Sequence, residues 1–168
     1  MPEASSPGTT ATQNLAGRYL TFMLEHESYG VDVLKVREII RLAQITAVPR
    51  MPAYVKGVIN LRGKIIPVMD LRLRFGFTNI HDTEQTCIVV VQTRLSAERT
   101  IQMGLVVDAV EEVVSISAAD IEETPDFGSQ ISADYILGLA KIKGAVKGLL
   151  DINRVMGSET MEAVTTNI

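Results

Sequence analysis

The sequence contains few of the residues that build metal sites, disulfides and nucleophilic active sites. Its 168 residues include one cysteine, two histidines and no tryptophan. The single cysteine, Cys87, excludes an intrachain disulfide and a zinc site made of thiolates. The histidines, His26 and His81, have no second ligand at metal-binding spacing. We therefore expect no metal and no cofactor, and we interpret Cys87 first as a packing residue in an apolar strand.

Enzyme motifs and membrane segments are also missing. The sequence has no glycine-rich phosphate loop and no Gly-x-Ser-x-Gly elbow. Its adjacent carboxylates at 111–112 and 122–123 would point to opposite faces of a strand, so they are interpreted as solvated surface. No stretch approaches the roughly 20 apolar residues that cross a bilayer, and the first residues do not resemble a signal peptide. We expect a cytoplasmic protein that is not an enzyme and does not insert into a membrane.

Basic residues are outnumbered by acidic ones. There are 16 lysines and arginines against 20 aspartates and glutamates, and the net charge is -4. This balance argues against nucleic acid as a partner, because Lys and Arg drive most binding to phosphates. A small β-barrel that binds single-stranded nucleic acid is nevertheless the main alternative, and an unrecognised enzyme is another. A barrel of that kind needs a basic groove and stacking aromatics, whereas the four tyrosines and four phenylalanines here are scattered.

The residues that are abundant favour β-sheet, and they repeat. Hydrophobic residues make up 46% of the chain while aromatics make up 5%, so Val, Ile and Leu dominate. The block 30–40 recurs at 104–114, and the longer block 57–71 recurs at 138–152 in the same order. Two matched blocks in order predict two similar β modules.

Each module is predicted to contain a tight hairpin turn and to close with a short helical turn. Glycine supplies the positive φ of such a turn, and Asp at a helix N-cap accepts hydrogen bonds from free backbone N–H groups. A glycine just beyond the helical turn, at 76 and at 157, would end it. The residues assigned to structural turns and caps are Gly30, Gly63, Asp70, Gly144 and Asp151.

The predicted domain organisation is simple. Residues 1–17 are expected to be a disordered tail, because they lack a hydrophobic period. Residues 18–157 are expected to form the domain, with β-barrel subdomains at roughly 18–80 and 81–157, and an exchange of strands between them is left open. Residues 158–168 follow as a C-terminal tail. The connections 46–54 and 115–134 are expected to be loops at the surface.

The residues alone point to a protein that works through its surface. In the segment 36–40 apolar and charged residues alternate, so one face joins the core while Arg37 faces outward, with Glu38 as a second candidate. Arg62 lies beside a turn glycine and is placed to pair with a carboxylate of a partner. An ordinary half-buried strand and simple solubility are the alternatives that remain open.

Several segments together resemble one protein family. Residues 29–39, 48–49, 56–63 and 66–72 closely resemble the CheW family of chemotaxis coupling proteins, and the likeness extends over about 18–156. The resemblance implies a mainly all-β fold of two intertwined SH3-like five-stranded barrels that pack through a third hydrophobic interface. It also implies a non-catalytic cytoplasmic adaptor that is recruited to membrane receptor arrays. Such adaptors link the cytoplasmic tips of methyl-accepting chemoreceptors to the regulatory domain of the histidine kinase CheA.

The resemblance also assigns two binding surfaces. The receptor-facing residues that it implies are Val36, Glu38, Ile39, Gly57 and Arg62. The kinase-facing residues that it implies are Arg41, Asp82 and Cys87. We expect Arg62→Asp to weaken receptor coupling without unfolding the protein. We expect Gly57→Asp to be more harmful, because the backbone there comes close to a neighbour.

Overall fold

The chain folds mainly into β-strands. The computed structural model describes residues 15–122 and 135–167, and residues 1–14 and most of the connection 115–134 lie outside that part. The strands are β1 (Gly17–Leu24), β2 (Glu27–Asp32), β3 (Val36–Arg41), β4 (Val55–Leu61), β5 (Lys64–Asp70), β6 (Cys87–Ser96), β7 (Arg99–Val107), β8 (Ala109–Ile116), β9 (Ile121–Glu122), β10 (Ile136–Ile142) and β11 (Ala145–Leu150). The helical elements are η1 (Val33–Lys35), α2 (Leu71–Arg74), η2 (Ala118–Asp120) and α3 (Ile152–Asn167).

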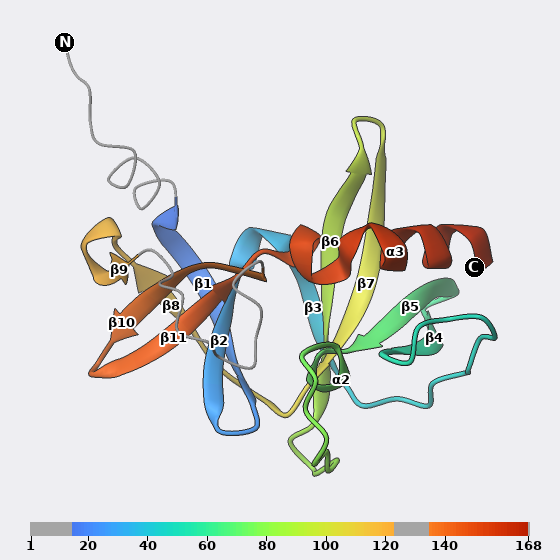
Figure 1. Ribbon diagram of the computed structural model, residues 1–168, viewed down its shortest axis with the longest axis horizontal. Coiled ribbons are helices and arrows are strands. Elements are labelled where there is room, and N and C mark those ends of the chain that lie inside the picture. Colours follow the sequence, from blue (N-terminus) through green and yellow to red (C-terminus); the bar gives the residue numbers. More distant parts are fainter. Residues whose placement is uncertain (1–14, 123–134, 168) are drawn as a thin grey trace.

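The strands form two sheets that lie side by side, and α3 runs across the one that contains β6 and β7 (Figure 1). We call the sheet with the order β8-β1-β2-β11-β10-β9 barrel A, and the sheet with the order β3-β6-β7-β5-β4 barrel B. Barrel A is on the left of the view and barrel B on the right. The mainly all-β, two-barrel fold expected from the sequence is confirmed, although the two-residue strand β9 gives barrel A a sixth strand.

Each barrel takes strands from both repeats. The hairpin β1–β2 of the first repeat lies in barrel A beside β8, β10 and β11 of the second, while the hairpin β6–β7 of the second lies in barrel B. Two parallel contacts make the exchange symmetric, since Val68 pairs with Gly104 and Leu149 pairs with Gly30. These four residues occupy corresponding positions in the repeat. The sheets therefore do not follow the boundary expected near residue 80.

Three hydrophobic clusters stabilise this arrangement. The largest fills the space between the barrels and against the helices, and each barrel has a smaller cluster of its own. Fully buried members of the central cluster come from both sheets and both helices: Phe22, Leu24, Val31, Met69, Leu71, Val91, Met103, Ile152 and Met156. The interior of barrel B is Ile59, Ile66, Val68, Ile88, Val90 and Val106. The interior of barrel A is Tyr19, Ile116, Ile121, Ala140 and Leu149.

The predicted hairpin turns have the expected geometry. Gly63 and Gly144 have φ values of 84° and 82°, and the residues before them, Arg62 and Lys143, are also left-handed at 53° and 51°. Two-residue loops with positive φ at both positions match the right-handed twist of the flanking strands. A non-glycine residue in the first position is uncommon, so each turn holds a long basic side chain in a strained backbone conformation.

The predicted caps are also present. The Asp70 side chain accepts a hydrogen bond from the backbone N–H of Arg72 at 2.9 Å and begins α2. The Asp151 side chain accepts from the N–H of Asn153 at 3.0 Å where α3 begins. These bonds satisfy backbone N–H groups that have no partner within the helix.

Four local expectations differ from the structure. Gly30 was assigned to turns and caps, but it lies inside β2, where an added Cβ would be 3.3 Å from the Leu149 side chain. The expected tail from residue 158 is helical, because the chain passes through Gly157 at φ 73° and then resumes the helix α3. The connection expected from residue 115 begins inside β8 and includes η2 and β9. Gly17, expected in the tail, is the first residue of β1.

Candidate functional site

The candidate receptor residues are centred on β3, which forms one end of the barrel B sheet. Arg37, Ile39 and Arg41 are exposed along β3, whereas Val36 and Glu38 are half-buried. Ile39 is 45% exposed and is one of five large hydrophobic side chains that are exposed among the described residues. We call the exposed residues Arg37, Ile39 and Arg41 the β3 face. The expectation for Arg37 is therefore met, whereas Glu38 lies on the other side of the strand and Ile39 faces outward.

An ion pair joins the two ends of the barrel B sheet. The Arg62 guanidinium, in the turn after β4, donates a hydrogen bond to the Glu38 carboxylate on β3. This hydrogen bond and the charge of Glu38 raise the pKa of Arg62. The Arg62 side chain is 73% exposed, so the pair is worth little for stability and stays available to an approaching partner. Sequence reasoning assigned both residues to one surface, and the structure brings them into direct contact.

Gly57 supports this edge from beneath. It is buried in β4 with φ 144°, and an added Cβ would lie 2.0 Å from the carbonyl oxygen of Thr46. Thr46 and Val58 exchange two backbone hydrogen bonds of 2.9 and 2.8 Å at the same place. The close backbone approach expected at Gly57 is confirmed, and its neighbour is the chain's own crossing segment. Gly57 shapes the surface and does not form part of it.

The candidate kinase residues lie near one end of β6. Arg41 on β3 is directly opposite Cys87 on β6, and Asp82 precedes that strand in the loop that follows α2. Cys87 packs against the central cluster. Burial raises the pKa of the Cys87 thiol, and a backbone hydrogen bond with Val110 offsets part of that effect. The protonated thiol therefore behaves as a small apolar group, while Arg41 and Asp82 are exposed.

A buried arginine ties Asp82 to the rest of the molecule. The guanidinium of Arg72 is 3% exposed and binds Asp70 at 2.9 Å, Asp82 at 2.8 Å and Asp108 at 3.0 Å. Burial alone would lower the pKa of Arg72, but hydrogen bonds to the carboxylates more than offset it and raise that pKa. Asp108 also accepts a hydrogen bond at 2.6 Å from the backbone of Glu25 in barrel A. One arginine thus joins both barrels to the loop before β6, and no sequence spacing revealed it.

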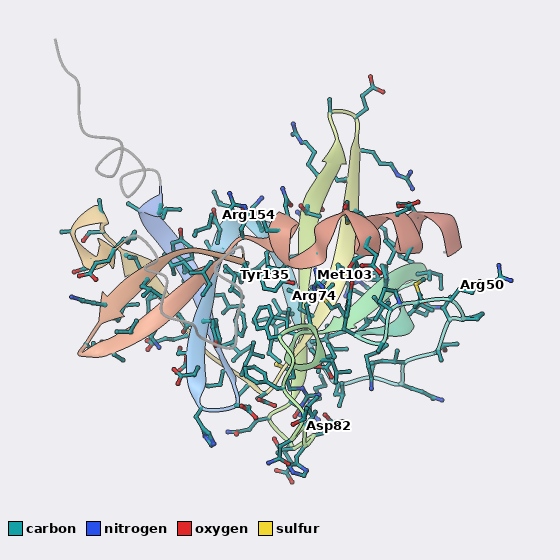
Figure 2. The ribbon with its side chains drawn as sticks, viewed as in Figure 1. Arg50, Arg74, Asp82, Met103, Tyr135 and Arg154 are labelled. Carbon is teal, nitrogen blue, oxygen red and sulfur yellow. The ribbon has the colours of Figure 1, made fainter. Side chains whose placement is uncertain are left out.

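A second arginine lies at the centre of the molecule. Figure 2 shows Arg74 and Tyr135 between the two barrels, far from Asp82. The Arg74 guanidinium stacks 4.5 Å from the ring centre of Tyr54 and 5.1 Å from that of Tyr135, and its Nε donates to the carbonyl of Val155 at 2.7 Å. The two tyrosines occupy corresponding positions in the repeat, each just before its hairpin. That correspondence is the sequence signal that could have identified this contact.

In the adjacent carboxylates at 111–112, only one side chain remains unpaired at the surface among the described residues. Glu111 was interpreted as solvated surface, but it binds the buried Lys147 at 3.3 Å and accepts a hydrogen bond from Ser28. Lys147 also donates to Ser28 at 2.8 Å. These residues connect three strands of barrel A. Glu112, by contrast, is exposed.

Within residues 15–122 and 135–167, no group of three His, Cys, Asp or Glu side chains is placed to hold a metal ion. In the same part of the chain, no helix is long and apolar enough to span a membrane.

Comparisons with known proteins identify the family. Residues 18–160 match the CheW-like domain. The chemotaxis protein CheW of Klebsiella aerogenes is 35% identical over 162 residues, covering 94% of this chain and 95% of that protein. The CheW of Bacillus subtilis is 30% identical over 155 residues, covering 92% and 96%.

A solved structure agrees with the sequence comparisons. The scaffolding protein TtCheW of Thermoanaerobacter tengcongensis superposes with a TM-score of 0.76 at 32% identity, covering 86% of this chain and 95% of that one. The repeat, the exchanged hairpins and these matches lead to one conclusion: the chain belongs to the CheW-like family of non-catalytic chemotaxis scaffold proteins.

Proposed function

We propose that this protein couples the cytoplasmic tips of methyl-accepting chemoreceptors to the histidine kinase CheA in the cytoplasm. The observation that carries the proposal is the exposed Ile39, which lies between the exposed Arg37 and Arg41 on β3, while the Glu38–Arg62 pair lies on the other side of that strand. An apolar anchor with charges around it suits a helical hairpin, which binds through apolar side chains and is oriented by charge.

The residues of the receptor surface have different roles in this proposal. Ile39 supplies the apolar contact, and Glu38 and Arg62 set orientation more than affinity, because Arg62 is exposed and the two are already paired. Val36 is half-buried against the central cluster and fixes the start of β3. Gly57 holds the crossing segment close to β4 and acts on the surface from within.

The kinase surface is proposed at the opposite end of β3 and the start of β6. Arg41 and Asp82 are exposed charges of opposite sign there, and Cys87 contributes packing beneath them. Because Asp82 is bound to Arg72, and Arg72 is bound to Asp108, a contact at this end is connected to both barrels. A rigid connection of that kind suits a scaffold that holds two partners in a fixed relation.

The test is recruitment of CheA to receptors. A receptor signalling fragment arrayed on vesicles is mixed with CheA and this protein, and both the pelleted CheA and its autophosphorylation are measured. We expect this protein to increase both quantities. Failure with a receptor and kinase that a known coupler activates would mean that the scaffold serves other partners.

A single variant tests the receptor surface. Arg62→Asp places two carboxylates together at the edge of barrel B, and we expect it to weaken receptor binding about tenfold while thermal unfolding stays nearly unchanged. Lys143→Asp is the matched control, because Lys143 occupies the same position of the other hairpin turn. Unchanged receptor affinity in Arg62→Asp would remove Arg62 from the site.

Nucleic-acid binding, the alternative, is not favoured. The chain carries four more acidic than basic residues, and its family consists of chemotaxis scaffolds.

A further inference from the structure

A small cleft in barrel B lies apart from both proposed surfaces. It has a volume of about 200 Å³ and lies between β5 and β7, beneath the last turns of α3. Its walls are residues 64–67 of β5, residues 99–102 of β7, and Val164 and Thr165 of α3. Figure 1 shows β5 and β7 meeting at one end and separating toward the other, where α3 crosses them.

The cleft exists because β7 is longer than its counterpart. The parallel pairing of β5 with β7 begins at Val68 and Gly104 and runs to Asp70 and Val106. Before that point β7 continues back to Arg99, where it pairs only with β6. In barrel A the equivalent strand β2 begins at Glu27, one residue before its pairing with β11 starts. The extra residues of β7 therefore present an unpaired strand edge to the cleft.

An unpaired strand edge is a site where another extended chain can add. Such edges offer backbone N–H and C=O groups, and peptide-binding domains use them to pair with an extended peptide. The lining contains the apolar Ile66, Ile101 and Val164 together with the polar Thr100, Gln102 and Thr165. Ile65, at the rim, is 53% exposed. The cleft thus combines unpaired backbone with a lining of mixed apolar and polar side chains.

The charge of the cleft indicates which kind of peptide fits. The chain as a whole is acidic, yet the lining contains Lys64 and Arg99 and no carboxylate. Among the ion pairs formed by the described residues, none includes Lys64 or Arg99. Both side chains are exposed and free to bind carboxylates.

We propose that this cleft binds an extended acidic peptide segment of a partner protein. The segment pairs with the free edge of β7, places one apolar side chain beneath α3, and sets carboxylates beside Lys64 and Arg99. A volume of about 200 Å³ is smaller than the 300–1,000 Å³ of typical small-molecule sites, and it suits one side chain of a peptide. This partner is additional to the receptor and the kinase, and the cleft does not depend on either assignment.

The experiment uses a defined peptide probe. The full-length protein, labelled with ¹⁵N, is titrated with a capped pentapeptide of alternating glutamate and valine, and amide shifts are followed by NMR. We expect shifts confined to residues 64–67, 99–103 and the end of α3. A pentapeptide of alternating lysine and valine and inorganic phosphate are titrated separately, and neither should reproduce these shifts.

Charge-reversal variants test the mechanism. Lys64→Glu combined with Arg99→Glu is expected to weaken peptide binding by at least about tenfold, because two charge-assisted contacts are lost. The control combines Lys56→Glu with Lys143→Glu, which changes the net charge equally at exposed sites elsewhere. Arg99→Gln alone should weaken binding by a smaller factor, and it serves if the double variant does not fold.

Several results would overturn the proposal. These are no shifts with millimolar glutamate–valine peptide, equal binding of both peptides, or equal weakening by the control variant. Phosphate producing the same shifts with the same affinity would show an anion site instead of a peptide site. Because Arg62→Asp leaves this cleft intact, loss of receptor coupling and loss of peptide binding can be distinguished.

Discussion

Gly57 and Gly138 occupy corresponding positions in the two repeats, and each lies against the carbonyl oxygen of a crossing segment. An added Cβ would be 2.0 Å from Thr46 O at Gly57 and 3.0 Å from Glu122 O at Gly138. The first distance is impossible without backbone movement, whereas the second requires a smaller adjustment. The same sequence position therefore has different tolerance in the two barrels.

This difference predicts unequal effects of alanine substitution. Gly57→Ala should lower the free energy of unfolding by about 3 kcal/mol, through steric overlap and a φ that alanine avoids. Gly138→Ala should cost about 1 kcal/mol. Urea denaturation of both variants measures the two values. Equal losses would contradict the close approach at Gly57, and Gly57→Asp should be worse than Gly57→Ala because it also buries a charge.

We expect substitution of Arg72 to lower the free energy of unfolding more than substitution of an exposed arginine does. Arg72→Met leaves the carboxylate of Asp70, which is 2% exposed, without its cation, and this should cost about 3–5 kcal/mol of unfolding free energy. Arg154→Met is the control, because its pair with Asp151 is at the surface and should contribute less than about 1 kcal/mol. Urea denaturation compares the two variants. A loss below 1 kcal/mol in Arg72→Met would show that the network is not stabilising.

At the scale of elements, α3 depends on contacts with both repeats. The part of α3 before Gly157 is stabilised at both of its ends. Asp151 caps its start, and Arg74 donates a hydrogen bond to the carbonyl of Val155 near its end, where a cation is favourable. After Gly157 the helix continues, because Thr160 is buried and hydrogen-bonded to the Tyr54 hydroxyl at 2.8 Å and Val164 is buried in the central cluster. The two parts of α3 therefore have separate attachments.

Because the two parts of α3 have separate attachments, we expect them to differ in local stability. Tyr54→Phe removes the hydrogen bond to Thr160 and should lower local stability by about 1 kcal/mol. Amide hydrogen exchange should become several-fold faster in residues 158–167 and stay unchanged in residues 152–156. Phe22→Leu, in the central cluster away from this bond, serves as the control and should affect both parts alike. Equal acceleration of both parts in Tyr54→Phe would show that α3 behaves as one unit.

At the scale of the whole molecule, the exchange of hairpins makes the two barrels interdependent. Barrel A lacks β1 and β2 without the first repeat, and barrel B lacks β6 and β7 without the second. The central cluster also takes side chains from both sheets. Neither half of the sequence can bury its apolar surface alone.

Fragments test this interdependence. Residues 1–78 and 79–168 should each be largely unfolded alone, and they should associate one to one when mixed, recovering the β-sheet circular dichroism signal. Size-exclusion chromatography gives the stoichiometry. Cooperative unfolding of either fragment by itself would show that a barrel forms without strand exchange.

Local sequence patterns determined much of the secondary structure of this protein. The β content, the positive φ at Gly63 and Gly144, the caps at Asp70 and Asp151, and the likeness of the two halves follow from short-range stereochemistry and from repeated residues. Local alternation also placed Arg37 outward on β3, whereas Glu38 is half-buried on the other side of that strand.

Only the tertiary structure decided how the repeats combine. Which strands pair, and hence the contacts Glu38–Arg62, Arg72 with three aspartates, and Arg74 between two tyrosines, depends on residues far apart in the chain. Gly30 was misassigned, and α3 was cut short at Gly157, because a strand interior and a helix continuation are stabilised by neighbours that are distant in sequence. Local propensity is about 1 kcal/mol per residue or less, so burial in a shared core overrides it.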